Sequence, residues 1–308
     1  MVIYEEIEIV KIYPQTYQQW LDFAEETLRE MLHKDPYATP KLDATLLLQF
    51  VTQRDKSAFI AYPETELNAE QLAQLAALLV RRATGEPMAY ILGQTDFWTL
   101  NLAVSKDTLI PRPDTEILVE LAVKLLKQRQ NSPHFDSEIR VLDLGTGTGA
   151  IALSIASELK KCGIKFKVFG VDLIENAVVL AKQNALHNGL SEVEFYQSAW
   201  FEKVSGKFDM IVSNPPYIDP QDPHLSQGDV RFEPLTALIA EEQGYADLRH
   251  IILHSQDYLK PEGYLLLEHG WQQGEKVRSI LAENLWVDIA TIKDYGDNER
   301  VSVAKLRD

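Results

Sequence analysis

The sequence predicts an α/β protein in which a doubly wound parallel sheet follows a smaller all-helical domain. After about residue 138, short apolar runs alternate with amphipathic stretches, the pattern of repeated βαβ units. Residues 16–85 instead carry leucines at helical spacing. Between these regions, apolar and polar residues alternate as they do in strands. The 308 residues give room for two domains of roughly 150 residues each.

The helical domain is placed at residues 1–85. Leu21, Leu28 and Leu32 share one helical face, and the stretch from Leu42 to 51 is again rich in leucine. A third helix is predicted over 68–83, with Asn68 as its N-cap. Such a bundle is typical of a packing or partner-docking module, and we assign it, as a hypothesis, to docking of a partner protein.

A β-hairpin linker is predicted over residues 86–108. Residues 89–97 and 98–106 are both expected to be extended, the second because apolar residues alternate with polar ones from Trp98 onward. A stiff turn follows at 110–114. The next helix is expected to run from Thr115 to Lys127 with Asp114 as its cap.

The remaining residues, 109–308, form the predicted catalytic domain. Helices are expected at 150–159, 174–187 and 274–284. The last two extended runs, 286–292 and 300–306, are expected to close the sheet as an antiparallel pair. Buried strands are expected at 139–144, 167–172, 193–197, 208–213 and 264–268.

Charge and composition narrow the class of function. The chain has 30 basic and 46 acidic residues, a formal charge of −16, which weighs against a protein that mainly grips a phosphate backbone. It favours a small-molecule or protein substrate. With one cysteine, Cys162, an acidic N-terminus and no apolar run near the roughly 18 residues of a membrane span, the sequence predicts a cytoplasmic protein.

A glycine-rich turn follows the first predicted strand of the sheet. The sequence VLDLGTGTG at 141–149 ends a strand and opens a helix, and its glycines let a ligand press against the backbone. Asp172 ends the next strand, 172 − 149 = 23 residues later, where a carboxylate accepts hydrogen bonds from ribose hydroxyls. The tight G-x-G-x-G spacing and the acidic Asp143, suited to an α-amino group, favour S-adenosylmethionine over NAD. The predicted cofactor residues of the loop are Gly145, Thr146, Gly147, Thr148 and Gly149.

A second motif, NPPY, follows the strand predicted at 208–213 and so lies at the same edge of the sheet. The Asn214 side-chain oxygen can accept one hydrogen of a planar –NH2 group, and the Pro215 carbonyl can accept the other. Tyr217 can stack on the planar group. Catalysis would then consist mainly of positioning and local electrostatics. This chemistry fits a carboxamide and an exocyclic base amine equally well.

Together the two motifs resemble the N-specific methyltransferases, and the chain as a whole resembles the release factor glutamine methyltransferase family. The resemblance covers roughly residues 16–306 and leaves the first fifteen as an extension. Further matching segments are RATGEP at 82–87, YILG at 90–93, TLIPRPDTE at 108–116, RFEP at 231–234 and EHG at 268–270. It implies a Rossmann-like class I S-adenosylmethionine-dependent methyltransferase sheet after an N-terminal helical domain and a hairpin.

The family resemblance also implies a substrate and its site. The substrate would be the glutamine amide, at N5, in the Gly-Gly-Gln motif of class 1 peptide chain release factors. The resemblance places the methyl donor on the glycine loop, Asp172 and Asn214, with Trp200 against the adenine. The substrate clamp carries over to Asn214, Pro215, Pro216 and Tyr217, of which Asn214, Pro215 and Tyr217 are the expected catalytic residues.

Two other readings stay open at this point. An adenine-N6 DNA or RNA base methyltransferase would use the same clamp, although base flippers need a basic channel. A catalytically inactive cofactor-binding module would bind the donor without transfer. Arg112 is expected either to line the cleft or to anchor the surface, loop 219–230 either to fold over substrate or to stay solvated, and His269 to be a packed histidine. The sequence contains no cluster of Cys and His residues that would indicate a metal site.

Overall fold

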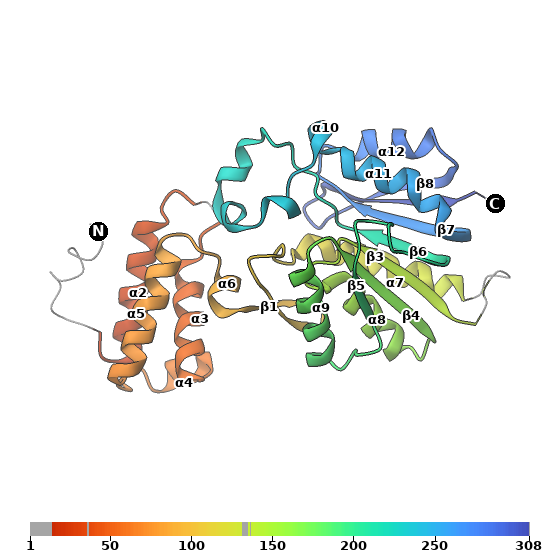
Figure 1. Ribbon diagram of the computed structural model, residues 1–308. Coiled ribbons are helices and arrows are strands. Elements are labelled where there is room, and N and C mark those ends of the chain that lie inside the picture. The colour runs from red at the N-terminus through yellow and green to blue at the C-terminus, as the bar shows by residue number, and fades with distance from the viewer. Residues whose placement is uncertain (1–13, 36, 131–134, 136, 308) are drawn as a thin grey trace. The chain divides into compact units, whose positions relative to one another are not determined.

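The computed structural model describes residues 14–35, 37–130, 135 and 137–307 (Figure 1). They form two compact units, each described below by itself. The first, here the helical unit, ends at Leu92 and also includes Ser226–Phe232. The second, the catalytic unit, comprises Gly93–Leu225 and the chain from Glu233 onward. Residues 1–13 of the extension noted above lie outside the described residues.

Packed helices make up the helical unit, as predicted. The longer ones are α2 (Tyr17–Met31), α3 (Pro40–Thr52) and α5 (Ala69–Ala83), joined by the short α4 (Lys56–Ala61). Asn68 caps α5 as expected, accepting from Gln71 N while the Gln71 side chain accepts from Asn68 N. The buried side chains that hold these helices together include Trp20, Leu28, Leu47, Leu48 and Leu75.

A buried ion pair joins two of these helices. The Arg82 guanidinium on α5 lies 2.8 Å from the Asp43 carboxylate on α3, and both side chains are almost fully buried. The segment Ser226–Phe232 attaches to the same place, because Asp229 lies 3.9 Å from Arg82 and Arg231 donates to the Thr84 carbonyl at 3.2 Å. Part of the predicted polar loop 219–230 therefore belongs to the helical unit.

The prediction that residues 89–97 are extended is wrong in its first half. Met88–Leu92 form a short helix, α6, in which Ile91 N donates to the Pro87 carbonyl at 3.1 Å, and Gly93 (φ 74°) ends it. A short apolar run fits a helix as well as a strand, so periodicity could not separate them. The hairpin itself is confirmed: β1 (Gln94–Phe97) pairs antiparallel with β2 (Leu100–Ala103).

Among the described residues of the catalytic unit, seven strands form one sheet in the order β5-β4-β3-β6-β7-β9-β8. The five strands from β5 to β7 are parallel to one another, and β9 is antiparallel to both β7 and β8. The predicted parallel sheet with an antiparallel closing pair is thus confirmed. The strands are β3 (Ile139–Leu144), β4 (Phe166–Asp172), β5 (Glu194–Gln197), β6 (Phe208–Ser213), β7 (Leu259–Glu268), β8 (Trp286–Lys293) and β9 (Glu299–Leu306).

Helices cover both faces of this sheet (Figure 1). Neighbouring residues of one strand point to opposite faces: Val141 packs with α7 (Glu116–Arg129), α8 (Ala150–Lys161) and α9 (Glu175–His187). Leu142 packs with α11 (Ala246–His254) and α12 (Gly274–Ala282). Short helical turns fill the connections: η1 (Pro113–Thr115), η2 (Pro223–Ser226), η3 (Gly228–Phe232), η4 (Leu235–Ala237), α10 (Glu241–Gly244) and η5 (Ser255–Asp257).

The prediction that Asp114 caps the helix at Thr115 is also wrong. Asp114 lies inside the 3-10 turn η1, and α7 begins only at Glu116. Its carboxylate instead lies 3.2 Å from the Arg300 guanidinium on β9. The two prolines around Arg112 make the chain turn once before the helix starts, which moves the cap position past Asp114.

No helix in the described part of the chain is both long and apolar enough to cross a membrane.

Candidate active site

A cavity of about 240 Å³ lies in the catalytic unit where β3, β4 and β6 end. Of the site residues predicted from sequence, eight line it: Gly145, Thr146, Gly147, Thr148, Asp172, Trp200, Asn214 and Pro216. Gly149, Pro215 and Tyr217 do not line it. The parallel register explains the convergence, because Leu144 of β3 is paired with Ser213 of β6 and with Val171 of β4. The glycine turn, Asp172 and Asn214 each directly follow or end one of these strands.

The glycine turn needs glycine for two different reasons. Gly145 and Gly147 have φ of 69° and 54°, which L side chains rarely adopt, and a Cβ on Gly147 would have no neighbour within 4 Å. That open space is where a ligand can approach the backbone. Gly149 is needed for packing, because a Cβ there would lie 3.1–3.3 Å from Leu153, Phe195 and Ala181.

Asp143 holds the turn through its side chain. Its Oδ2 accepts from the Thr146 hydroxyl (2.7 Å) and from Ala152 N (3.2 Å). The carboxyl is completely buried, and burial raises its pKa to about 7. Its Oδ1 has no hydrogen-bond partner among the described residues. One acceptor is thus unused at the loop that we expected to suit an α-amino group.

Asp172 joins the turn to the next strand. Its Oδ2 accepts from Gly147 N and its Oδ1 from Ile174 N, both at 2.9 Å. Partial burial raises the pKa of the carboxyl. A carboxylate oxygen has two lone pairs, so both oxygens can also accept from vicinal hydroxyls in the cavity. The turn and Asp172, which both line the cavity, therefore fit an adenosine-type ligand.

Trp200 flanks the same cavity. Its backbone is left-handed (φ 46°), and its carbonyl accepts from the Ser198 hydroxyl at 3.0 Å. The indole lies against Gly145, where a Cβ would stand 3.6 Å from the six-membered ring. A flat aromatic face beside the glycine turn can stack on a purine.

The clamp residues differ in how they are held. Asn214 Nδ2 donates to the Thr115 hydroxyl at 3.2 Å, which leaves Oδ1 as the acceptor of this amide. Tyr217 donates its phenolic hydrogen to Glu268 Oε1 at 3.4 Å, and its backbone carbonyl accepts from Gln273 Nε2 at 3.0 Å. Burial and the Glu268 charge raise the pKa of Tyr217, so the phenol stays protonated.

The structure adds residues that sequence reasoning left open or missed. Arg112 lines the cavity and also forms an ion pair with Glu233, whose side chain is fully buried and accepts from Ile110 N at 3.0 Å. Of the two expected positions of Arg112, the cleft lining is the one observed, and its ion pair is with a buried carboxylate rather than at the surface. Asp247 of α11 was missed; it lines the cavity, and burial raises its pKa. Sequence reasoning could not find it, because its helix is distant in sequence from the glycine turn and carries no recognisable motif.

His269 is a packed histidine, as expected. It is fully buried, its Nε2 lies 2.9 Å from the Ser302 hydroxyl and burial lowers its pKa. In the described part of the chain, no group of three or more His, Cys, Asp or Glu side chains is arranged to hold a metal ion.

Replacing Asp172 by alanine is expected to weaken binding of S-adenosylmethionine more than it slows turnover. Two hydrogen bonds to a charged acceptor are worth about 1.5–3 kcal/mol each, and ribose contacts are equal in ground and transition states. We expect the Kd measured by calorimetry to rise at least tenfold, with kcat at saturating donor within a few-fold. Unchanged affinity would contradict the assignment.

Comparison with known proteins identifies the family. Residues 19–93 match the PrmC N-terminal domain, and residues 135–300, more than half of the chain, match a methyltransferase domain. The release factor glutamine methyltransferase of Pasteurella multocida is 58% identical over 95% of this chain and 100% of its own length. Those of Haemophilus influenzae and Escherichia coli are 55% and 49% identical, over 93% and 94% of this chain and 98% of each relative.

The sheet, the helical unit and the cofactor cavity are thus consistent with the similarity to these relatives, which extends over nearly the whole chain. The fold is the class I methyltransferase fold. S-adenosylmethionine is the methyl donor of this class, and the cavity residues fit it. The chain belongs to the release factor glutamine methyltransferase family of S-adenosylmethionine-dependent enzymes.

Proposed function

We propose that this enzyme methylates the side-chain nitrogen, N5, of the glutamine in the Gly-Gly-Gln motif of class 1 peptide chain release factors, and so supports translation termination. The observation that carries the proposal is the position of Asn214. Its Nδ2 is held by the Thr115 hydroxyl, so its amide oxygen remains as the acceptor of the side chain, in the same cavity as the glycine turn and Asp172. An acceptor there suits a nitrogen that must present its lone pair to a methyl donor.

The clamp explains how an amide can react. A carboxamide nitrogen is a poor nucleophile because its lone pair is delocalised. When Asn214 Oδ1 and the Pro215 carbonyl each accept one of its hydrogens, electron density moves back to nitrogen and the lone pair is aimed. Bound S-adenosylmethionine supplies an already activated methyl group. The N–C bond would form as the S–CH3 bond of the donor breaks, S-adenosylhomocysteine would leave, and one amide hydrogen would pass to water as a proton. These residues therefore act mainly by positioning and by local electrostatics.

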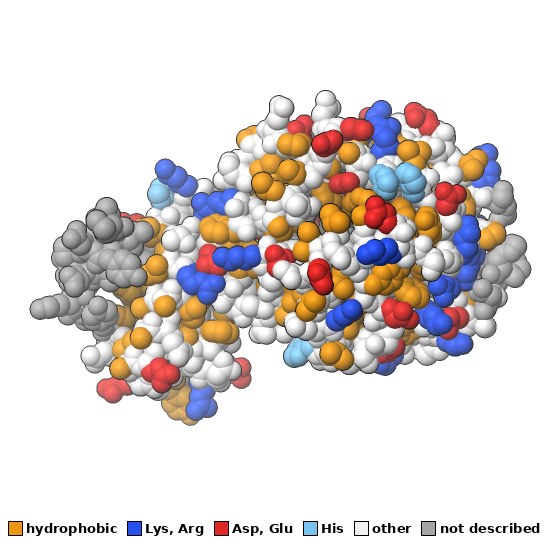
Figure 2. Space-filling view, in the orientation of Figure 1, with side chains coloured by type: hydrophobic (Ala, Val, Ile, Leu, Met, Phe, Trp, Pro, Cys, Tyr) orange, Lys and Arg blue, Asp and Glu red, His pale blue; other side chains and the backbone are white. Residues whose placement is uncertain are grey.

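The alternative, a DNA or RNA adenine-N6 methyltransferase, gains no support. The relatives compared above are named release factor glutamine methyltransferases. The chain carries a formal charge of −16, and over most of the face in Figure 2 basic and acidic side chains are interspersed rather than gathered into a basic channel. Binding a nucleic acid backbone needs such a channel.

Methyl transfer from labelled S-adenosylmethionine tests the proposal directly. Purified release factor, the same protein with its Gly-Gly-Gln glutamine replaced, and duplex DNA are offered in parallel, and mass spectrometry locates the label. Label on that glutamine, absent from the replaced protein, is the expected result. Label on adenine would support the alternative, an adenine methyltransferase. Donor binding without methyl transfer to any substrate would indicate an inactive binding module.

We also propose that the enzyme is located in the cytoplasm, where its substrate works. Cell fractionation tests this location.

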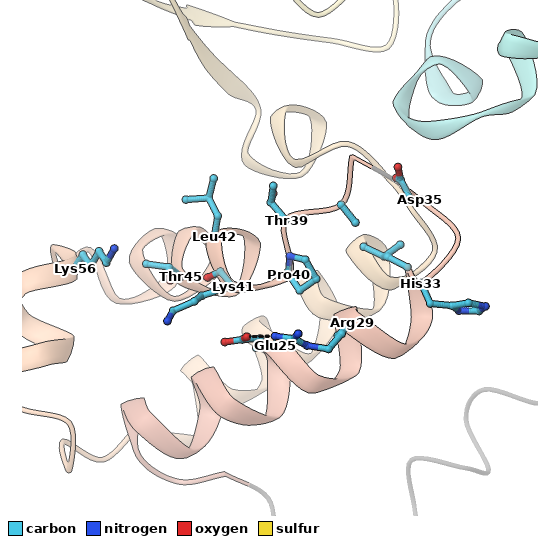
Figure 3. A pocket seen from close by; sticks show the side chains of 12 residues that line it. Glu25, Arg29, His33, Asp35, Thr39, Pro40, Lys41, Leu42, Thr45 and Lys56 are labelled. Atoms are coloured by element: carbon cyan, nitrogen blue, oxygen red, sulfur yellow. Dashed lines mark hydrogen bonds and ion pairs between the residues drawn. The ribbon is translucent and has the colours of Figure 1, made fainter.

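The helical unit is proposed to dock the release factor. A hollow of about 630 Å³ opens between α2, α3 and the start of α4 (Figure 3). Arg29, Lys41 and Lys56 line it with Glu25 and Asp35, and Glu25 is paired to Arg29. The lining is therefore net positive in a chain of charge −16, which suits an acidic segment of a partner.

Reversing two of these charges should weaken docking without changing the chemistry. The variant Lys41→Glu with Lys56→Glu is expected to raise KM for the release factor about tenfold, through a lower association rate, with kcat unchanged. Lys124→Glu with Lys127→Glu, two exposed lysines on α7, is the matched control and should have little effect. Equal KM values in both variants would remove the hollow from docking.

A further inference from the structure

A buried carboxyl lies behind the clamp without a part in the chemistry described so far. Glu268 is the last residue of β7, and its neighbour Leu267 is paired with Ser213 of β6. The parallel register therefore sets Glu268 next to Asn214, the residue that follows Ser213. Glu268 is 1% exposed, and burying a carboxyl so completely is costly unless its partners compensate.

The contacts of Glu268 lead to both ends of the clamp. Its Oε1 accepts from the Tyr217 phenol at 3.4 Å. The Thr115 hydroxyl faces the same carboxyl and favours its ionised form, and Thr115 in turn accepts from Asn214 Nδ2 at 3.2 Å. The other oxygen, Oε2, is buried with no hydrogen-bond partner among the described residues. The carboxyl is thus connected to Asn214 through one hydroxyl and to Tyr217 directly.

The direction of this chain of hydrogen bonds decides what Asn214 offers the substrate. An ionised carboxylate only accepts hydrogen bonds, so the Thr115 hydroxyl hydrogen must point toward Glu268. The Thr115 lone pairs then face Asn214, which must present Nδ2 to Thr115 and Oδ1 to the cavity. A neutral group at 268 can donate as well as accept. Thr115 could then turn its hydrogen toward Asn214, and the amide could flip its –NH2 toward the substrate.

We propose that Glu268 is a positioning residue of the acceptor site, which fixes the orientation of the Asn214 amide through Thr115 and holds the Tyr217 ring through its phenol. The inference rests on the proposed clamp function of Asn214. It assigns a role to the EHG segment at 268–270 beyond packing.

The charges around Glu268 make its effect depend on pH. Burial is the main reason that the pKa of its carboxyl is raised to about 7; Asp114 also raises it, and the Thr115 hydroxyl, Arg300 on β9 and the Tyr217 hydroxyl lower it. Next to it, burial lowers the pKa of His269, which stays neutral. The carboxyl therefore ionises as pH rises through about 7, and the fixed orientation of Asn214 forms in the same range.

Kinetics and NMR of Glu268→Gln test the proposal with the full-length enzyme. At saturating S-adenosylmethionine, we expect wild-type kcat to rise with pH through about 7 and that of Glu268→Gln to be flat. Well above this pH, the variant should be about 10- to 100-fold slower. The side-chain –NH2 signal of Asn214, assigned by its loss in Asn214→Ala, should shift over the same pH range in wild type but not in Glu268→Gln.

Thr115 supplies the matched pair of variants. Thr115→Val removes the hydroxyl and should reproduce the slow, pH-independent turnover of Glu268→Gln, with no further loss in the double variant. Thr115→Ser keeps the hydroxyl and should restore the wild-type profile. The affinity for S-adenosylhomocysteine, measured by calorimetry, should stay within a few-fold of wild type in these four variants. This control distinguishes Glu268 from Asp143, because burial raises the pKa of Asp143 to about 7 as well but Asp143 lies at the cofactor loop.

Each outcome decides a different question. An acid limb that persists in Glu268→Gln, or wild-type turnover by Thr115→Val, would overturn the inference. So would a variant that loses only thermal stability, since packing alone would not shift the Asn214 signal. If wild-type enzyme methylates no release factor, the proposed function fails, and the NMR titration still tests whether Glu268 orients Asn214.

Discussion

Replacing Asn214 by alanine should lower kcat for release-factor methylation by a factor on the order of 10²–10³, the loss that follows removal of one preorganised hydrogen-bonding group at a reacting centre. The variant loses the acceptor that we assign to the substrate amide, while the glycine turn, Asp172 and Trp200 still line the cofactor cavity. We therefore expect the Kd for S-adenosylmethionine to stay within a few-fold. Single-turnover kinetics and calorimetry measure the two quantities separately.

An asparagine outside the cavity provides the control for this prediction. Asn101 on β2 uses its side chain to donate to Asp96 at 2.9 Å within the hairpin. Asn101→Ala should keep wild-type kcat and donor affinity. If Asn214→Ala turns over at the wild-type rate, the clamp has no part in the mechanism; if it loses donor affinity as strongly as turnover, Asn214 belongs to the cofactor site rather than to the acceptor site.

Local patterns were sufficient to predict most of the fold. The sheet strands are short apolar runs between amphipathic helices, and the capping residue of α5, Asn68, is visible in the sequence. The failures have physical causes. Met88–Leu92 is an apolar run too short to show a period. Asp114 has the right chemistry for a cap, but it lies in a 3-10 turn that begins at Pro113 and forms an ion pair with Arg300, a partner distant in sequence.

The site was predictable only where a motif carries it. The glycine turn, Asp172 and Asn214 follow directly on strands, so their meeting at one edge could be inferred from parallel topology. Asp247 and the Thr115–Glu268 connection could not, because side-chain direction and long-range pairing decide them. Tyr217 shows the same limit: its phenol reaches the buried Glu268, which no local pattern indicates.

Loss of the Asp209 carboxylate is expected to destabilise the catalytic unit by about 3–5 kcal/mol. Asp209 on β6 is fully buried and lies 2.9 Å from Lys260 Nζ and 3.3 Å from Arg129 Nε, and it also accepts from Arg140 N at 2.9 Å. Asp209→Ala leaves the buried Arg129 with only the more distant, partly exposed Glu262 carboxylate, at 3.6 Å, and removes the acceptor of a backbone N–H. Urea unfolding measures the change in the free energy of unfolding of the catalytic unit. The transition of this unit is identified as the one that S-adenosylhomocysteine shifts to higher urea concentration, because the ligand binds only the folded unit.

The comparison with an exposed ion pair shows why burial, and not pairing, sets this magnitude. Glu192 lies 2.7 Å from Lys160, and both side chains are largely exposed, so Glu192→Ala should cost less than about 1 kcal/mol. Removing charge from both buried partners, in Asp209→Leu with Arg129→Met, should recover part of the loss, because the penalty comes from a buried cation that has lost its buried carboxylate and keeps only the partly exposed Glu262. A double variant less stable than Asp209→Ala would mean instead that Arg129 stabilises the fold chiefly through its other contacts, the Pro261 carbonyl at 2.8 Å and the Glu262 carboxylate at 3.6 Å.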